Sequence, residues 1–178
     1  MVIYLQIFAI SGRAQHGKDT AAEILSAQLR SRNHDVAVLH YADPLKLCLC
    51  SLGWDGEKDE LGRELLQQSA DRIRIKEPNF LINFMLSFIN LFEDDFDFLI
   101  IPDARFPDEI SRLKEGGCAV HHIHVFRPNY TSPLTERQKT HFSEHALDRV
   151  LPDHIIINNG SIECLTSSVC HYLNKIGL

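Results

Sequence analysis

The nine residues Gly12–Thr20, with the sequence GRAQHGKDT, constrain the fold more than any other stretch of the chain. They nearly match the phosphate-binding pattern G-x-x-x-x-G-K-[ST], in which glycines let backbone N–H groups surround phosphates and the lysine reaches the terminal phosphates. An apolar run precedes the loop and an amphipathic segment follows it, so the loop opens a helix whose dipole favours anions. The candidate cofactor-binding residues are Gly12, Arg13, Ala14, Gln15, His16, Gly17, Lys18, Asp19 and Thr20.

Two residues of this loop, Lys18 and Asp19, determine most of its expected chemistry. Lys18 opposes the dipole of the helix that starts beside it, so an anion is the expected reason for its position, and it is a catalytic candidate. Asp19 stands where a Ser or Thr hydroxyl normally coordinates Mg²⁺, and Thr20 comes one residue later. Both are candidate metal ligands. We predict that the chain binds a nucleoside triphosphate together with Mg²⁺.

Size and charge limit the other classes of function. The chain has 178 residues and 44% hydrophobic content, which predicts one domain over residues 1–178. Its net charge of -6 and lack of a basic run argue against nucleic acid as a partner. No apolar run approaches the roughly 20 residues of a membrane span, and no signal peptide is recognisable, so we expect a cytoplasmic protein. The five cysteines, an odd number, are expected to be reduced thiols.

Strand and helix patterns alternate along the whole chain. The helical segments begin after the loop, at Asp43, near residue 59, near residue 80, at Pro107 and near Ser161. The segments with strand character are 3–11, 36–41, 96–102, 119–126 and 154–158. This alternation predicts an α/β fold with three layers, α/β/α, around a central parallel sheet of about five strands. The polar segment of about 128–145 is expected to be a mobile lid.

Several polar residues come directly after predicted strands. Asp43, Asp103 and Asn158 do so, as does the phosphate-binding loop, and ligands collect at the carboxyl ends of parallel strands. Asp103 is a candidate for holding Mg²⁺ or its waters, and Arg105 for neutralising charge on a transferred phosphoryl group. Both are catalytic candidates. The alternative for this pair is a helix cap or a local salt bridge.

The helix of residues 59–76 has a polar face with a functional interpretation. At 100° per residue, Arg63, Gln67 and Arg74 lie within about 40° of one another. Two arginines and an amide on one face suit a monophosphate and the base or sugar attached to it. These three residues are therefore candidate substrate-binding residues, with an ordinary solvated helix face as the alternative.

The lid and the last strand add weaker candidates. Cationic residues such as Arg137 on a closing segment suit a kinase lid, although a solubilising loop has the same composition. Asn159 follows the last strand and suits either the nucleotide base pocket or a simple turn. Arg137 and Asn159 are further candidate cofactor-binding residues. The histidines at 121, 122 and 124 lack a carboxylate partner and are not expected to bind metal.

With these motifs the chain resembles the deoxynucleoside monophosphate kinases of phage and bacterial type. The resemblance rests on the Gly-Lys-Asp-Thr ending of the loop and on five further segments, and it runs nearly from end to end. The segments are Asp43–Lys46, Leu66–Gln67 leading to Asp71, Asp103–Glu109, Phe126–Pro128 and Ser143–Leu147. The shorter phosphomevalonate kinases of animals share the Gly-Lys-Asp ending, so the identity of the acceptor stays open.

The resemblance implies a P-loop kinase fold, ATP as phosphoryl donor, Mg²⁺ as cofactor and a nucleoside monophosphate as acceptor. It implies that Asp19 or Thr20, with help from Asp103, holds the metal. The acceptor phosphate would be held by Arg63 and Arg74 together with Lys46, and Asp43 is a further substrate-binding candidate. The alternatives are a kinase of another phosphorylated metabolite, like phosphomevalonate kinase, a nucleotide-hydrolysing switch, and a nucleotide-binding module without transfer activity. Whether the chain forms a homodimer is left open.

Overall fold

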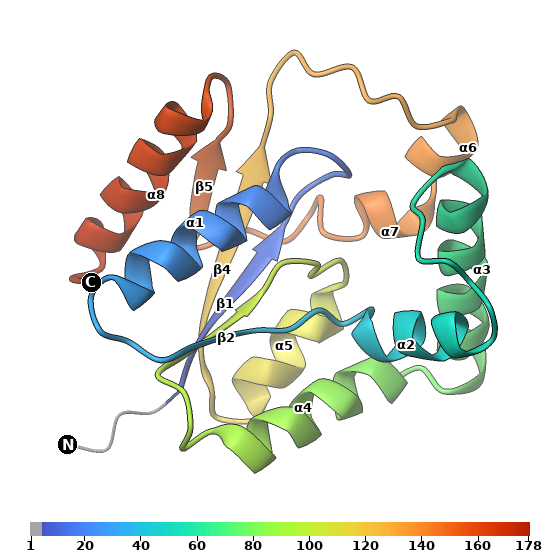
Figure 1. Ribbon diagram of the computed structural model, residues 1–178, viewed down its shortest axis with the longest axis horizontal. Helices are drawn as coiled ribbons and strands as arrows, with labels where there is room; N and C mark the ends of the chain where they lie inside the picture. Colours follow the sequence, from blue (N-terminus) through green and yellow to red (C-terminus); the bar gives the residue numbers. More distant parts are fainter. Residues whose placement is uncertain (1–4) are drawn as a thin grey trace.

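Five parallel strands form one sheet in the computed structural model, which describes residues 5–178 (Figure 1). The order is β2-β3-β1-β4-β5, so β1 lies at the centre, and Gln6 pairs with both Phe98 and Ala119. The strands are β1 (Gln6–Ser11), β2 (Val36–Val38), β3 (Phe98–Ile101), β4 (Ala119–Phe126) and β5 (His154–Ile157). The prediction of a parallel sheet with about five strands is confirmed. The first two residues of the predicted strand 3–11 lie outside the described residues.

The side chains of β1 alternate between the two faces of the sheet, and this alternation explains the three layers. Phe8 and Ile10 point to one face of the sheet, where they join a core cluster with residues of α1 and α8. Ile7 points to the other face and packs in a second cluster with residues of α4 and α5. Successive side chains of a strand alternate between faces, so one apolar strand serves both layers. These helices are α1 (Lys18–Arg30), α4 (Phe80–Phe92), α5 (Pro107–Glu115) and α8 (Ile162–Lys175).

The other four helices lie beyond the carboxyl ends of the strands and enclose the site (Figure 1). They are α2 (Asp43–Ser51), α3 (Glu60–Lys76), α6 (Glu136–Lys139) and α7 (Phe142–His145). Asp59 begins α3 by accepting a hydrogen bond from the Gly62 N–H at 2.7 Å, as a typical N-cap does. The predicted lid therefore contains two short helices, α6 and α7. Thr135 and Gln138 form a capping box at the start of α6.

None of the helices within residues 5–178 combines the length and the apolar character needed to cross a membrane. The apolar helix α4 has only 13 residues. One side of α4 packs on the sheet through Leu81, Ile82, Met85 and Ile89, which are buried. Its opposite side remains exposed.

Candidate functional site

The phosphate-binding loop is packed against the ends of β4 and β5. Gly12 has φ +138°, and a Cβ there would lie 2.3 Å from the carbonyl oxygen of Val125. Gly17 has φ +94°, and a Cβ there would lie 2.5 Å from Nδ2 of Asn158. Asn158 also donates from Nδ2 to the His16 carbonyl at 3.0 Å. Both glycines of the motif are therefore required by backbone conformation and by space.

Lys18 is buried at the start of α1, as the motif requires. Its Nζ donates to the carbonyl oxygen of Arg13 at 2.9 Å, so the side chain curls back over the loop. Burial, reinforced by the nearby Arg105 guanidinium, lowers the pKa of Lys18 to about 8. Folding has already removed most of the water around the Lys18 ammonium. An anion that arrives beside it therefore interacts strongly, because little further desolvation of the lysine is needed.

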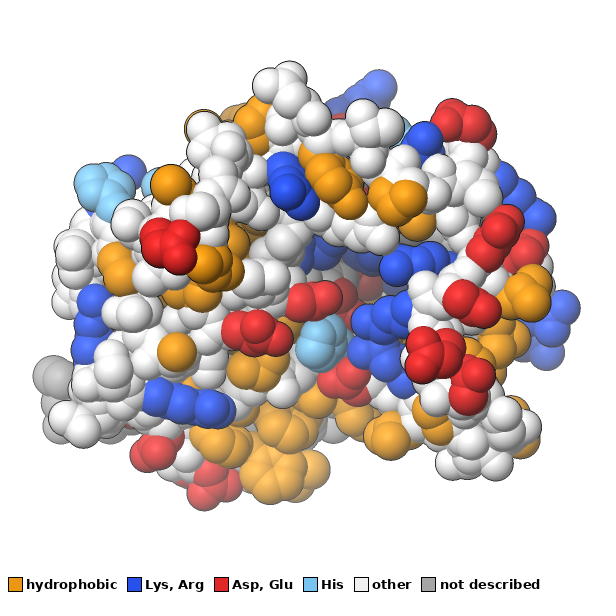
Figure 2. Space-filling model, turned by 45° about the horizontal axis from the view of Figure 1, so that its top comes forward, with side chains coloured by type: hydrophobic (Ala, Val, Ile, Leu, Met, Phe, Trp, Pro, Cys, Tyr) orange, Lys and Arg blue, Asp and Glu red, His pale blue; other side chains and the backbone are white. Residues whose placement is uncertain are grey.

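A cavity of about 310 Å³ extends from this loop to α3. In Figure 2 the molecule is hollowed near the centre of the view, with basic, acidic and histidine side chains around the hollow. The predicted site residues that line the cavity come from four segments of the chain: Ala14, Gln15, Lys18, Asp19, Lys46, Arg63, Gln67, Arg74, Asp103 and Arg105. The carboxyl ends of the strands thus bring the phosphate-binding loop, the carboxylate of Asp103 and the arginines of α3 to one cavity.

The polar face predicted for α3 is confirmed as a geometric feature, since Arg63, Gln67 and Arg74 all line the cavity. Arg74 donates from Nη2 to Oε1 of Glu109 at 2.9 Å. Its guanidinium carbon lies 3.5 Å from the centroid of the Phe106 ring. Arg74 is therefore fixed by an ion pair and a cation–π contact on one side while it faces the cavity on the other.

Glu109 is almost completely buried behind Arg74. Its Oε2 accepts from the backbone N–H groups of Arg105 at 2.7 Å and Phe106 at 3.1 Å, which closes the turn before α5. Burial raises the pKa of Glu109 to about 7, although these two N–H groups and Arg74 favour the charged form. The acid shapes the turn that carries Arg105.

Asp103 fixes the connection between β2 and α2. Its two carboxylate oxygens accept from the backbone N–H groups of Tyr41 at 2.8 Å and Ala42 at 3.1 Å. The connection that it holds leads to Asp43, whose carboxylate pairs with Lys46 at 2.8 Å. Lys46 lines the cavity, whereas Asp43 is not among the lining residues.

His40 joins the start of α2 to the phosphate-binding loop. Its Nδ1 lies 3.3 Å from Oδ2 of Asp43, and its Nε2 lies 3.6 Å from Oδ1 of Asp19. Hydrogen bonding to Asp19 and then to Asp43 raises the pKa of His40 to about 9, so the imidazole is cationic at neutral pH. The same pairing keeps the pKa of Asp19 below its usual range.

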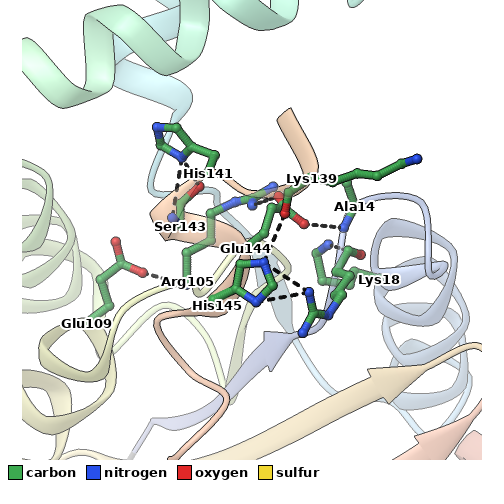
Figure 3. A network of polar contacts seen from close by, with 10 residues as sticks. Ala14, Lys18, Arg105, Glu109, Lys139, His141, Ser143, Glu144 and His145 are labelled. Atoms are coloured by element: carbon green, nitrogen blue, oxygen red, sulfur yellow. Dashed lines mark hydrogen bonds and ion pairs between the residues drawn. The ribbon is translucent and has the colours of Figure 1, made fainter. Parts of the chain in front are cut away.

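The predicted lid contacts the loop through Glu144 of α7 (Figure 3). Oε2 of Glu144 accepts from the Ala14 N–H at 2.8 Å, and Oε1 pairs with Nη1 of Arg105. Burial alone would raise the pKa of Glu144, but the charge and hydrogen bond of Arg105, the Ala14 N–H and the charge of Lys18 together hold it below its usual range. On the same segment, Asp148 pairs with Arg13 at 3.0 Å.

A second cavity of about 400 Å³ lies on the other side of the loop. Asp19, Thr20 and Lys18 line it, together with Arg127 at the end of β4 and Asn158 after β5. Lys18 and Asp19 also line the first cavity, so the loop separates two spaces and reaches into both.

Five predicted cofactor-binding residues do not line either cavity: Gly12, Arg13, His16, Arg137 and Asn159. Arg137 is exposed and pairs with Glu64 of α3 at 2.7 Å. Asn159 is exposed beside Asn158, which takes the lining position instead. The side chain of Arg13 turns toward the segment after α7.

The donor set suits Mg²⁺ bound together with phosphates. In kinases this ion is held by one or two protein oxygens, with phosphates and water supplying the rest. Asp19 has a largely exposed carboxylate facing both cavities, and Thr20 lines one of them. Within residues 5–178 no three His, Cys, Asp or Glu residues converge as a metal cage. A phosphate-dependent Mg²⁺ site does not need one.

Sequence reasoning missed His40 and Glu144. His40 comes just after β2, and this place at the carboxyl end of a strand was a usable signal. Glu144 lies within the segment Ser143–Leu147 that carries the family resemblance, which was a usable signal, although in the four-residue helix α7 no periodic pattern distinguishes an inward acid from a solvated one. Its contacts span more than 35 residues of sequence.

Comparisons with known proteins agree with this geometry. Residues 63–169, more than half of the chain, match the family model described as deoxynucleotide monophosphate kinase. The deoxynucleotide monophosphate kinase of Enterobacteria phage T4 is 31% identical over 116 residues, which is 65% of this chain and 43% of that protein. The chain therefore spans less than half the length of this curated relative.

Solved structures of similar fold cover nearly the whole chain, including the loop that precedes the family match. The APS kinase CysC of Mycobacterium tuberculosis, in complex with AMPPNP and APS, has a TM-score of 0.54 at 14% identity, covering 96% of this chain and 98% of that one. Shikimate kinase from Bacteroides thetaiotaomicron has a TM-score of 0.50 at 12% identity, covering 97% and 99%. These likenesses show a P-loop kinase fold.

Proposed function

The chain belongs to the deoxynucleotide monophosphate kinase family, and from this premise we propose that it transfers the γ-phosphoryl group of ATP to a deoxynucleoside monophosphate. One observation carries the proposal. A single cavity has the loop lysine, Lys18, on one side and the polar face of α3, with Arg63, Gln67 and Arg74, on the other. Direct phosphoryl transfer needs donor and acceptor phosphates in line within one such space.

The donor triphosphate binds along the loop. Lys18 and the loop N–H groups hold its β- and γ-phosphates, as helix N-termini with glycine-rich loops do. The nucleoside part of ATP extends into the second cavity, between Arg127 and Asn158. The γ-phosphate then points into the first cavity, because Lys18 lines both spaces.

The acceptor monophosphate binds across the cavity. Arg63 and Arg74 supply planar guanidinium groups that suit phosphate oxygens, and Lys46 adds a third positive charge. Gln67, between the two arginines on the same face, supplies an amide for the base or the sugar. Three cations in one cavity favour an acceptor that already carries a phosphate.

Catalysis is chiefly positioning and neutralisation of charge. Lys18 and Arg105 lie where negative charge spreads over the transferring phosphoryl group. No strong general base is required, because a phosphate oxygen of the acceptor is already ionised at neutral pH. Segment 128–145, which contains α6 and α7, excludes water when both nucleotides are bound.

Mg²⁺, when bound, would offset the negative charge of the donor phosphates. Asp19 and Thr20 at the start of α1 are the residues that would hold it, with Asp103 acting through bound water. Asp103 already accepts two backbone hydrogen bonds, and its remaining lone pairs allow this indirect contact.

The test is a screen for ADP formation with ATP, Mg²⁺ and the purified chain. The acceptors are the four common deoxynucleoside monophosphates, their ribose counterparts and phosphomevalonate. The proposal predicts ADP formation that depends on at least one deoxynucleoside monophosphate. Turnover with phosphomevalonate alone, or ATP hydrolysis that no acceptor accelerates, would contradict it.

A further inference from the structure

Glu144 of α7 connects two parts of the site that come from distant places in the sequence. One carboxylate oxygen accepts from the Ala14 N–H of the phosphate-binding loop, and the other pairs with the guanidinium of Arg105 (Figure 3). The side chain of Glu144 is only 5% exposed. We infer that Glu144 is a positioning residue, which holds Arg105 beside the loop for phosphoryl transfer, an inference that rests on the proposed function.

The way Arg105 is held supports this role. A guanidinium has five N–H donors in a rigid plane. Within residues 5–178 the side chain of Arg105 makes one hydrogen bond, from Nη1 to Glu144. Arg105 also lines the cavity. One contact therefore restrains the position of the guanidinium and leaves its other N–H donors for a phosphate.

Charge balance gives a second argument. Arg105 and the buried Lys18 lie close enough to repel each other. Two uncompensated cations in a buried place are costly unless a negative charge accompanies them. Glu144 supplies that charge and also interacts favourably with Lys18. It lets both cations stay in place before the nucleotide arrives.

Two other roles for Glu144 make different predictions. The Glu144 carboxylate lies near a loop N–H, Lys18 and Arg105, as a bound anion would. If it occupied the γ-phosphate site itself, it would compete with ATP for that site. A residue that only anchored α7 to the loop would act through stability. The segment has a second link to the loop, the partly exposed pair of Asp148 and Arg13, and this link does not involve Arg105.

The test compares Glu144→Gln with Arg105→Ala, with the double variant and with Asp148→Asn as the matched control. The glutamine keeps the shape but turns an amide N–H₂ toward either the Ala14 N–H or Arg105, where an acceptor is needed. For each protein, kcat and KM for ATP and the acceptor, together with Tm, are measured. Activity of the wild type is established first, so a failure of the proposed function appears before any variant is compared.

We expect Glu144→Gln to lower kcat about 10- to 100-fold while KM for ATP changes less than about threefold. The double variant should be no slower than Arg105→Ala within about twofold, because both changes remove the same contact. Asp148→Asn should keep kcat within about twofold of the wild type. If Glu144→Gln does not fold, Glu144→Asp replaces it. The aspartate keeps the charge but is too short to reach both partners, so it should lower kcat in the same non-additive way.

Three results would overturn the inference. Tighter ATP binding by Glu144→Gln with undiminished kcat would make the carboxylate a competitor of phosphate. A lowered Tm with normal kcat would make it a structural anchor. Independent, multiplying effects of the Glu144 and Arg105 changes would show that they do not act through each other.

Discussion

Arg74 donates a hydrogen bond to Glu109 at 2.9 Å, so one arginine of the cavity-lining face of α3 is also the ion-pair partner of a buried acid. Glu109 is 2% exposed and in turn holds the backbone N–H of Arg105. Arg74 and the turn that carries Arg105 are therefore coupled through one carboxylate. Arg63, on the same face of α3, has no ion pair within residues 5–178.

This contrast predicts different effects for the two arginines. Arg74→Ala should raise KM for the acceptor and also lower the free energy of unfolding by about 2–3 kcal/mol, since it leaves Glu109 buried without its partner. Arg63→Ala should raise KM for the acceptor with little loss of stability. Urea unfolding and steady-state kinetics check both. Equal loss of stability in the two variants would remove the Glu109 contact from the explanation.

The loss of stability in Arg74→Ala should depend on pH. Without Arg74, the ionised Glu109 carboxylate would be a buried charge without its ion-pair partner, so the carboxylate binds a proton. Binding this proton costs less free energy at low pH. The pKa of Glu109, already raised by burial to about 7, should rise further in this variant. We therefore expect a smaller loss of unfolding free energy at pH 5.5 than at pH 8. An opposite trend would mean that Glu109 stays ionised.

His40 gives a second pH dependence with a defined sign. Its pKa is raised from 6.5 to about 9 by Asp19 and Asp43, so its stabilisation is complete below about pH 6.5 and disappears as the pH rises through 9. In metal-free buffer, the wild type should exceed His40→Asn in unfolding free energy by on the order of 1–2 kcal/mol at pH 6, allowing for solvent screening. The difference should shrink by pH 9.5. A difference that is constant across this range would contradict the pairing.

Three glycines with positive φ should rank by what surrounds them. Gly53→Ala should cost about 1 kcal/mol, because no atom lies within 4 Å of the new Cβ and only backbone strain remains. Gly17→Ala should cost about 2 kcal/mol, since the Asn158 side chain must also move. Gly12→Ala should cost more than about 3 kcal/mol, because its Cβ meets the backbone of Val125. Denaturant unfolding measures the order, and a Gly12 effect no larger than that of Gly53 would contradict the packing of the loop.

Two arginines near the lid should differ in their effect on ATP. Arg127 lines the second cavity, with its guanidinium carbon 4.4 Å from the Tyr130 ring centroid. Arg137 is paired with Glu64 and lines neither cavity. Arg127→Ala should therefore raise KM for ATP about fivefold or more, whereas Arg137→Ala should change it less than about twofold. The reverse order would place the donor nucleoside beside α6.

The sequence predicted the order and type of the main helices and strands well, because each has a local signal. Apolar runs marked β1 and β3, and Pro107 followed by acidic residues marked the start of α5. The arginine face of α3 followed from 3.6-residue periodicity alone. Such features depend on residues that are neighbours in sequence.

The parts of the site that could not be predicted depend on contacts between distant segments. Glu144 meets Ala14 and Arg105 across 130 and 39 residues. Arg137 is predicted to bind the cofactor from its charge and place in the lid, and its pairing with Glu64 of α3 could not be predicted in the same way. Composition cannot distinguish such a cation from one that faces ATP.

Transfer of the labelled γ-phosphate of ATP to a deoxynucleoside monophosphate tests the central claim most directly. Product analysis of the wild type should show label in the deoxynucleoside diphosphate, and Lys18→Ala should fold normally but form this product at least about 10³-fold more slowly. Label found only in inorganic phosphate, or equal transfer by Lys18→Ala, would contradict the account.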